Sequence, residues 1–170
     1  MCFCVYEKFL AKNPLIPFII FKHRSTTVTY ACTTIHGLVL ACLLYYLPLY
    51  YEAVKGMSPV ITGLAILPET LTLVPASVIT GVIITRTGVY RWAIWMGWII
   101  TTIGMGLLMF LDVDTPTQAW IGLNLVIGIG TGLLFGAMGF AVQASVDPES
   151  IAIAVCMFLF FRSFGSVGIL

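Results

Sequence analysis

The chain has 170 residues, of which 60% are hydrophobic and only 9% carry a charged side chain. A soluble domain carries about 25% charged residues, so this composition excludes an ordinary water-soluble fold and indicates that lipid covers most of the surface. The formal net charge of +1 argues against a nucleic-acid partner, which requires clustered basic residues. The five cysteines show no paired spacing, so we expect packing residues rather than a disulfide framework or a metal site.

Residues 1–25 are expected to be a cytoplasmic lead-in to the first membrane span. Their first apolar run is interrupted by Glu7, Lys8 and Lys12, and no small-residue cleavage site follows it. These features argue against a cleaved signal peptide.

Residues 26–170 contain five apolar stretches, each near the length of a membrane-spanning helix. Such a helix needs about 20 residues to cross a hydrocarbon core about 30 Å thick. The alternating strands of about ten residues that a membrane barrel needs do not occur. The predicted fold is therefore all-α, a polytopic membrane bundle. The predicted spans are 28–51, 60–85, 92–111, 119–142 and 151–170.

The basic residues predict how these spans are oriented. Four of them precede the first span, and Arg86 and Arg91 separate the second span from the third. The opposite side of the membrane carries only Lys55 among basic residues. By the positive-inside bias, the N-terminus and the Arg86–Arg91 loop are predicted to be cytoplasmic.

Two charged residues, Glu69 and Arg162, lie inside predicted spans. Counted from the predicted span ends, both lie about 13 Å from the outer face. A charge at mid-bilayer costs at least about 2.5–3.5 kcal/mol, so such residues normally face the bundle interior or an aqueous cavity. Both are candidates for proton coupling or substrate contact, and contact between them is a further hypothesis. The alternatives are a buried structural ion pair or side chains that snorkel toward the interface.

His36 and Tyr50 are candidate pathway residues in the first span. His36 is the one histidine inside a predicted span, and imidazole can exchange protons near neutral pH. The alternative role of His36 is a hydrogen bond between helices. Tyr50 lies on nearly the same helical face, so both side chains are expected to line one pathway.

The fourth span is rich in glycine and contains Gly128, Gly132 and Gly136 at intervals of four. Residues four apart share one helix face, so these glycines predict close approach of a neighbouring helix. No strand precedes the run and no lysine follows it, which excludes a phosphate-binding loop. The sequence contains no catalytic set and no cofactor motif, so we expect neither an enzyme nor a bound cofactor.

An ordered series of short motifs runs through nearly the whole chain from Glu7 onward. One of them, Gly81-Val-Ile-Ile-Thr-Arg86-Thr-Gly88, is similar to a degenerate inter-helix loop signature in which Thr85 stands where an acidic residue is expected. The series resembles the major facilitator superfamily, in particular its fungal branch of 14-helix drug:proton antiporters. The other motifs are Asn13–Arg24, His36-Gly37, Tyr45–Tyr50, Gly56–Pro59, Leu67-Pro68, Gln143-Ala144 and Arg162-x-x-Gly165.

The resemblance implies that the five spans correspond to core helices seven to eleven of a transporter with two six-helix halves. Residues 2–6 are similar to the tail of a preceding helix, and the twelfth core helix is expected to be missing. Substrates of such transporters bind near the midplane between the halves. The first and fourth spans are therefore expected to line the cavity, and the second and fifth to meet the other half.

The expected function is transmembrane transport of small molecules, as proton-coupled export of toxic compounds or secondary metabolites by a truncated family member. Glu69 is then the candidate protonatable group, His36 and Tyr50 are pathway residues, and Arg162 is a partner or substrate contact. The expected partners are the lipid bilayer, the substrate, protons and the missing transporter half, and the expected location is the plasma membrane. The alternatives are a non-functional fragment and a helical interaction or scaffold subunit.

Overall fold

The computed structural model describes residues 24–112, 116–146 and 148–168, and these residues form an all-α bundle. The predicted all-α fold is therefore confirmed. Most of the predicted lead-in, residues 1–23, and the last two residues of the fifth predicted span lie outside the described residues. The helices are α2 (Arg24–Ala53), α3 (Pro59–Thr87), α4 (Arg91–Leu107), α5 (Thr117–Gln143) and α6 (Ile151–Val167), with short 3-10 turns at Leu108–Phe110 and Pro148–Ser150.

Four of these helices are long and apolar enough to cross a membrane. They are α2, α3, α4 with its 3-10 extension to Phe110, and α5. The apolar helix α6 has 17 residues, which corresponds to about 26 Å at 1.5 Å per residue. Each helix overlaps one of the five apolar stretches of the sequence, because hydropathy already marks where a helix can be surrounded by lipid.

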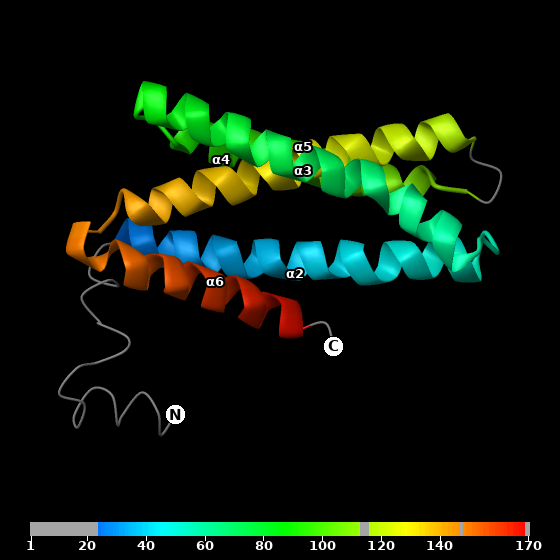
Figure 1. Ribbon diagram of the computed structural model, residues 1–170, viewed down its shortest axis with the longest axis horizontal. Coiled ribbons are helices and arrows are strands. Elements are labelled where there is room, and N and C mark those ends of the chain that lie inside the picture. The colour runs from blue at the N-terminus through cyan, green and yellow to red at the C-terminus, as the bar shows by residue number, and fades with distance from the viewer. Residues whose placement is uncertain (1–23, 113–115, 147, 169–170) are drawn as a thin grey trace, which may run out of the picture.

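The helices form two layers, with α2 beside α6 in one layer and α3, α4 and α5 in the other (Figure 1). Helix α5 is the centre of the bundle, because it contacts all four of the other helices. Helix α4 connects α3 to α5 along the chain and runs in the opposite direction to both, so α3 and α5 point the same way, as do α2 and α6 (Figure 1). Two pairs of parallel helices therefore define the arrangement.

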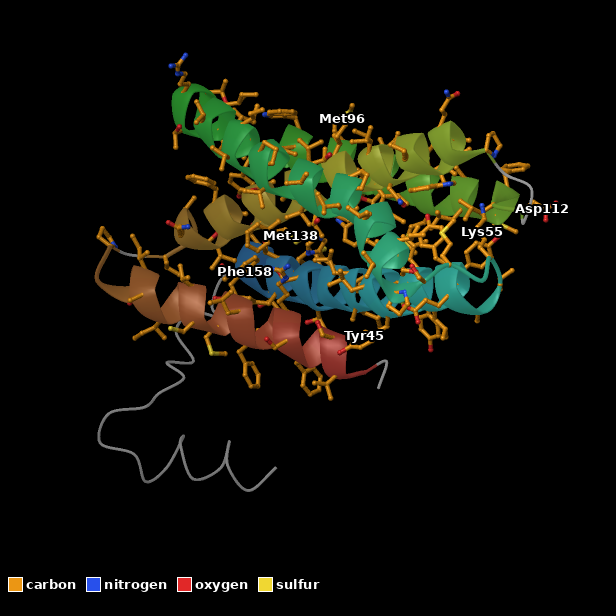
Figure 2. All side chains as sticks on the ribbon, turned by 45° about the vertical axis from the view of Figure 1, so that its right-hand side comes forward. Tyr45, Lys55, Met96, Asp112, Met138 and Phe158 are labelled. Atoms are coloured by element: carbon orange, nitrogen blue, oxygen red, sulfur yellow. The ribbon has the colours of Figure 1, made fainter. Side chains whose placement is uncertain are left out.

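Apolar side chains fill the interior and also cover the outside of the bundle. Met138 of α5 and Phe158 of α6 are buried in the largest core cluster, between the two layers (Figure 2). Tyr45 and Met96, in contrast, point outward and are exposed (Figure 2). An outer surface of this kind is stable in hydrocarbon and not in water.

Glycines set the close approach of α5 to α3. A Cβ atom added at Gly128 would lie 2.6 Å from the carbonyl oxygen of Glu69, and one at Gly132 would lie 2.5 Å from that of Leu73. At Gly136 the same distance, to the carbonyl oxygen of Ser77, is 2.7 Å. The two parallel helices therefore pack backbone to backbone in one continuous register, which side chains larger than hydrogen would prevent.

Helices α2 and α6 pack in the same manner. A Cβ atom added at Gly37 would collide with the carbonyl oxygen of Arg162, and one at Gly165 would collide with that of Thr34. The hydroxyl of Ser166 donates a hydrogen bond of 3.2 Å to the carbonyl oxygen of Gly37. This crossing fixes the depth of Arg162 relative to α2.

Charged residues lie at the two ends of the bundle, because in the sequence they fall between the apolar stretches. Arg24, Arg86 and Arg91 are exposed where α2 begins, α3 ends and α4 begins, on the left of Figure 1. Lys55 and Asp112 are both at the opposite end (Figure 2). Charged residues at the two ends and apolar residues between them are what a membrane-spanning bundle requires.

Candidate functional site

The buried polar side chains of the bundle gather around α5, where α2 and α3 meet it. Such residues are costly in an apolar interior and therefore mark candidate functional positions. These polar residues form two groups along α5. One lies in the N-terminal half of the helix, and the other lies about two turns further on. The first contains Tyr51, Glu69 and Asn124, and the second contains His36 and Thr131.

Glu69 of α3 lies in the first group, and its side chain is only 1% exposed. Its Oε2 atom has no hydrogen-bond partner among the described residues. Asn124 of α5 is fully buried, and its Nδ2 donates hydrogen bonds to the carbonyl oxygen of Ala65 at 2.9 Å and to the hydroxyl of Tyr51 at 3.2 Å. Three helices thus contribute to one polar cluster.

The register of α3 on α5 places Glu69 within this cluster. Asn124 is level with Ala65, and one turn further along both helices Gly128 is level with Glu69. In a helix the Cα–Cβ bond tilts toward the N-terminus, so the Glu69 side chain extends back toward the level of Asn124. Gly128 has no side chain, so the backbone of α5 packs directly against that of Glu69.

His36 of α2 forms the second group with the backbone of α5. Its Nε2 lies 3.2 Å from the carbonyl oxygen of Thr131, and the ring is fully buried. A carbonyl oxygen only accepts, so Nε2 must carry the hydrogen, and in the neutral ring Nδ1 is then an acceptor. Within the described residues Nδ1 has no hydrogen-bond partner. His36 therefore both links two helices and keeps a free position for a proton.

Arg162 of α6 does not pair with Glu69 in the described part of the chain. Its guanidinium carbon lies 4.3 Å from the centre of the Phe135 ring on α5, in a cation–π arrangement. Its charge also acts on the nearby His36 ring. Within the described bundle the two intramembrane charges therefore do not make the hypothesised contact, because Glu69 faces α5 and α2 whereas Arg162 lies against another turn of α5.

Tyr50 faces a different part of the bundle from His36. Its hydroxyl donates a hydrogen bond of 3.1 Å to the carbonyl oxygen of Leu111, beyond α4. It also lines a cavity of about 230 Å³ between α2 and α4. His36 and Tyr50 are separated by about 21 Å along α2 and contact different helices. The neighbouring residue, Tyr51, is the one that joins the polar cluster.

The loop motif occupies the end of α3. Gly81 is buried, and a Cβ atom added there would lie 2.8 Å from the Phe140 ring of α5. Arg86 is exposed in the last turn. Gly88 ends the helix with a φ angle of 68°, and its amide donates to the carbonyl oxygen of Ile84. Glycine adopts this left-handed conformation without strain, so Gly88 terminates the helix.

A larger groove of about 510 Å³ lies between α3, α5 and α6. Its walls are mainly apolar and aromatic. They include the Phe135 ring, over which the Arg162 guanidinium lies. The hydroxyls of Ser77 and Thr85, which also line it, donate to carbonyl oxygens of their own helix. Residues of the groove include Ser77, Gly81, Thr85, Phe135, Phe140, Gln143, Phe158 and Leu159.

The sequence interpretation missed Asn124, Tyr51 and Thr131. Asn124 carries a signal that was available, because an amide side chain in the middle of an apolar run is costly unless it finds partners. Tyr51 gives no such signal, since tyrosines near span ends normally face the interface. Thr131 contributes only its backbone carbonyl oxygen, and because every residue has this group, the sequence gives no signal for it.

Comparison with known proteins places these features in a family. The family model described as Major Facilitator Superfamily matches residues 6–169. A protein of Phoma sp. named MFS transporter L2 is 52% identical over 165 residues, which are 97% of this chain and 28% of that protein. Efflux pump FUS6 of Gibberella fujikuroi is 33% identical over 156 residues, which are 92% of this chain and 28% of the pump.

A third relative is the MFS-type transporter of the acurin A biosynthesis cluster in Aspergillus aculeatus. It is 31% identical over 165 residues, which are 97% of this chain and 30% of that transporter. The chain thus spans less than a third of the length of these curated relatives.

Proposed function

Because the chain belongs to the major facilitator superfamily, we propose that it forms part of a proton-coupled exporter of small molecules such as toxic compounds or secondary metabolites. The chain is a multi-pass integral membrane protein, and the relatives it matches are named as transporters and efflux pumps. We place it in the plasma membrane, with the basic end of the bundle and the N-terminus on the cytoplasmic side.

The observation that carries this proposal is the buried carboxyl group of Glu69. It is 1% exposed, and its Oε2 has no hydrogen-bond partner among the residues in the described ranges. An ionisable group inside a membrane bundle is expensive to maintain and is a functional-site hypothesis by default. A carboxyl group that alternates between charged and neutral forms is the simplest means of coupling a proton to a conformational change.

The other polar residues receive supporting roles. His36 keeps a free Nδ1 beside α5, so we assign it to proton transfer along the bundle. Arg162 lies on Phe135, a wall residue of the large groove, so we assign it to substrate contact. Tyr50 lines the smaller cavity between α2 and α4 and remains a candidate pathway residue.

The groove between α3, α5 and α6 supports an apolar substrate. Its volume of about 510 Å³ lies within the range of about 300–1,000 Å³ that small-molecule sites occupy. Aromatic and aliphatic walls with few polar groups favour a lipophilic molecule over a sugar or an ion.

A second candidate function is that of a helical interaction subunit that packs against a complete transporter. The observation that favours it is the outer face of α3, which is apolar and uncovered in the described bundle. The residues of this face are Val60, Leu64, Leu71, Val74 and Val78, each at least half exposed.

Reconstitution into liposomes tests the proposed function. The chain is incorporated alone, a pH gradient is imposed, and uptake of a lipophilic fluorescent cation is followed over time. We expect gradient-dependent uptake that is lost in Glu69→Gln and kept in Glu52→Gln, a matched change at an exposed glutamate at the end of α2. No uptake by the unmodified chain would contradict transport by this chain alone and favour the subunit role.

A further inference from the structure

Two buried oxygen atoms on neighbouring helices lack the hydrogen bonds that such atoms require. They are Oε2 of Glu69 on α3 and Oδ1 of Asn124 on α5, and neither has a partner among the described residues. Their side chains are 1% and 0% exposed, so bulk water does not reach them. Unsatisfied polar atoms of this kind are rare in native proteins and call for an explanation.

Both atoms are acceptors, because an ionised carboxylate and an amide oxygen have no hydrogen to donate. They cannot satisfy each other in that state, and two oxygen lone pairs in an apolar interior repel one another. A single added proton changes the balance. The neutral carboxyl group has an O–H donor, and an amide oxygen is a good acceptor for it.

The packing of α3 on α5 holds the two groups in one place. Asn124 donates to the carbonyl oxygen of Ala65, which is one turn before Glu69 on the same face. Glu69 extends back toward that turn, and Gly128 lets the backbone of α5 pack directly against the carbonyl oxygen of Glu69. The same Asn124 amide also donates to the hydroxyl of Tyr51, so α2 joins the group.

Few other titratable groups face Glu69 from the helices that pack against α3. From α2 the facing group is Tyr51, which interacts electrostatically with Glu69, and Tyr50 beside it points to Leu111. Helix α5 carries no charged or titratable side chain over its whole length. On α3 itself the other charge, Arg86, is exposed in the last turn. Glu69 is thus the acidic side chain of this neighbourhood among the described residues.

We propose that Glu69 and Asn124 form one buried proton-binding unit, in which the neutral Glu69 carboxyl donates its hydrogen to Oδ1 of Asn124. The proton comes from water, no other bond is made or broken, and its release leaves a carboxylate. Asn124 is the positioning residue, and through Nδ2 it links the proton-loaded carboxyl to Tyr51 of α2. This inference rests on the proposed role of Glu69 as the protonatable group.

The unit gives proton binding a structural consequence. In the loaded state, the hydrogen bond from the Glu69 carboxyl to Oδ1 adds a further link between α3 and α5 to the bonds that Nδ2 of Asn124 already makes to Ala65 of α3 and Tyr51 of α2. After release, a carboxylate and an amide oxygen face each other without a donor, which favours separation of the helices or entry of water. Protonation is thereby coupled to how these three helices pack.

Infrared spectroscopy of the purified chain in liposomes tests the unit directly. The C=O stretching band of a neutral carboxyl group shifts to higher frequency when its O–H loses a hydrogen-bond acceptor. A pH titration in sodium-free buffer is recorded for the unmodified chain, and Glu69→Gln identifies the band that belongs to Glu69. We expect this band to shift to higher frequency in Asn124→Leu.

Two further variants keep the test decisive. Tyr51→Phe retains the ring and removes the hydroxyl that Asn124 contacts, and we expect a smaller shift in the same direction. Ser145→Ala is the control, because Ser145 follows α5 and its hydroxyl donates to Ala141, far from Glu69. We expect the control band to stay at the frequency of the unmodified chain.

The outcomes separate this inference from the proposed function. A Glu69 band that does not move in Asn124→Leu and Tyr51→Phe would overturn the proton-binding unit and leave Glu69 as a protonatable group. A band that disappears when sodium is added at constant pH would mean that the two oxygens bind a cation, which also overturns it. The absence of any Glu69-dependent band, together with unchanged uptake in Glu69→Gln, would overturn both.

Discussion

Replacing Gly132 by alanine is the most direct test of how α3 and α5 pack. Gly132 is buried at the middle of their contact, and the added Cβ atom would lie 2.5 Å from the carbonyl oxygen of Leu73 and 2.8 Å from Cβ of Ala76. The obstacle at Leu73 is backbone, so no side-chain rotation relieves it. Gly139 is the matched control on the same helix, because a Cβ atom there has nothing within 4 Å.

The structure sets the size of the effect. Ordinary contact begins at 3.4 Å, so the two helices must separate by about 0.9 Å to accept the methyl group of Gly132→Ala. Overpacking of this kind costs about 1–3 kcal/mol, whereas the higher helix propensity of alanine contributes about 1 kcal/mol in both variants. The propensity gain cancels between Gly132→Ala and Gly139→Ala, so their stabilities should differ by about 1–3 kcal/mol.

Thermal denaturation in detergent measures this difference. At about 2–4 °C per kcal/mol for a chain of this size, the apparent Tm of Gly132→Ala should lie about 2–12 °C below that of Gly139→Ala. Gly139→Ala itself should match or exceed the unmodified chain. Equal Tm values for the two variants would refute the backbone contact between α3 and α5 that the register predicts.

Three further predictions follow from single contacts. Gly88→Ala should lower the apparent Tm because a φ angle of 68° costs a residue with a Cβ atom about 1–2 kcal/mol, and an unchanged Tm would contradict the helix end described above. His36→Leu should be less stable than His36→Gln by about 1–3 kcal/mol in the same assay, because glutamine has an N–H group that can donate to the carbonyl of Thr131. Phe135→Leu should remove a cation–π interaction worth about 0.5–2 kcal/mol. Labelling by phenylglyoxal should therefore modify Arg162 faster in that variant, and an unchanged labelling rate would argue against the stacked arrangement.

The glycine-rich face of α5 could be predicted from the sequence, but the helix that packs on it could not. The spacing of Gly128, Gly132 and Gly136 predicts one smooth helix face, because residues four apart share a face of any α-helix. It does not predict which helix lies on that face. In the structure it is α3, and the register along α3 places Glu69 beside Gly128. That register depends on the sum of all contacts between the helices.

The two intramembrane charges show the same limit. The number of residues from each span end sets the depth of Glu69 and Arg162, and the hypothesis of contact between them used depth alone. Contact also depends on the rotation of each helix about its axis, which packing decides. Rotation turns Glu69 toward α5 and Tyr51 of α2, and it turns Arg162 onto the Phe135 ring.

The sequence by itself determined the class of the protein and the position of its helices. A helix in lipid must be a long apolar stretch whose backbone hydrogen bonds are made within the helix. This requirement is local, so each segment can be recognised by itself. The candidate site was only half determined, since the sequence indicated Glu69 and His36 but not their partners. Asn124 and Thr131 lie on α5, far along the chain from Glu69 and His36, and only tertiary packing brings α5 to these two residues and Tyr51 to Asn124.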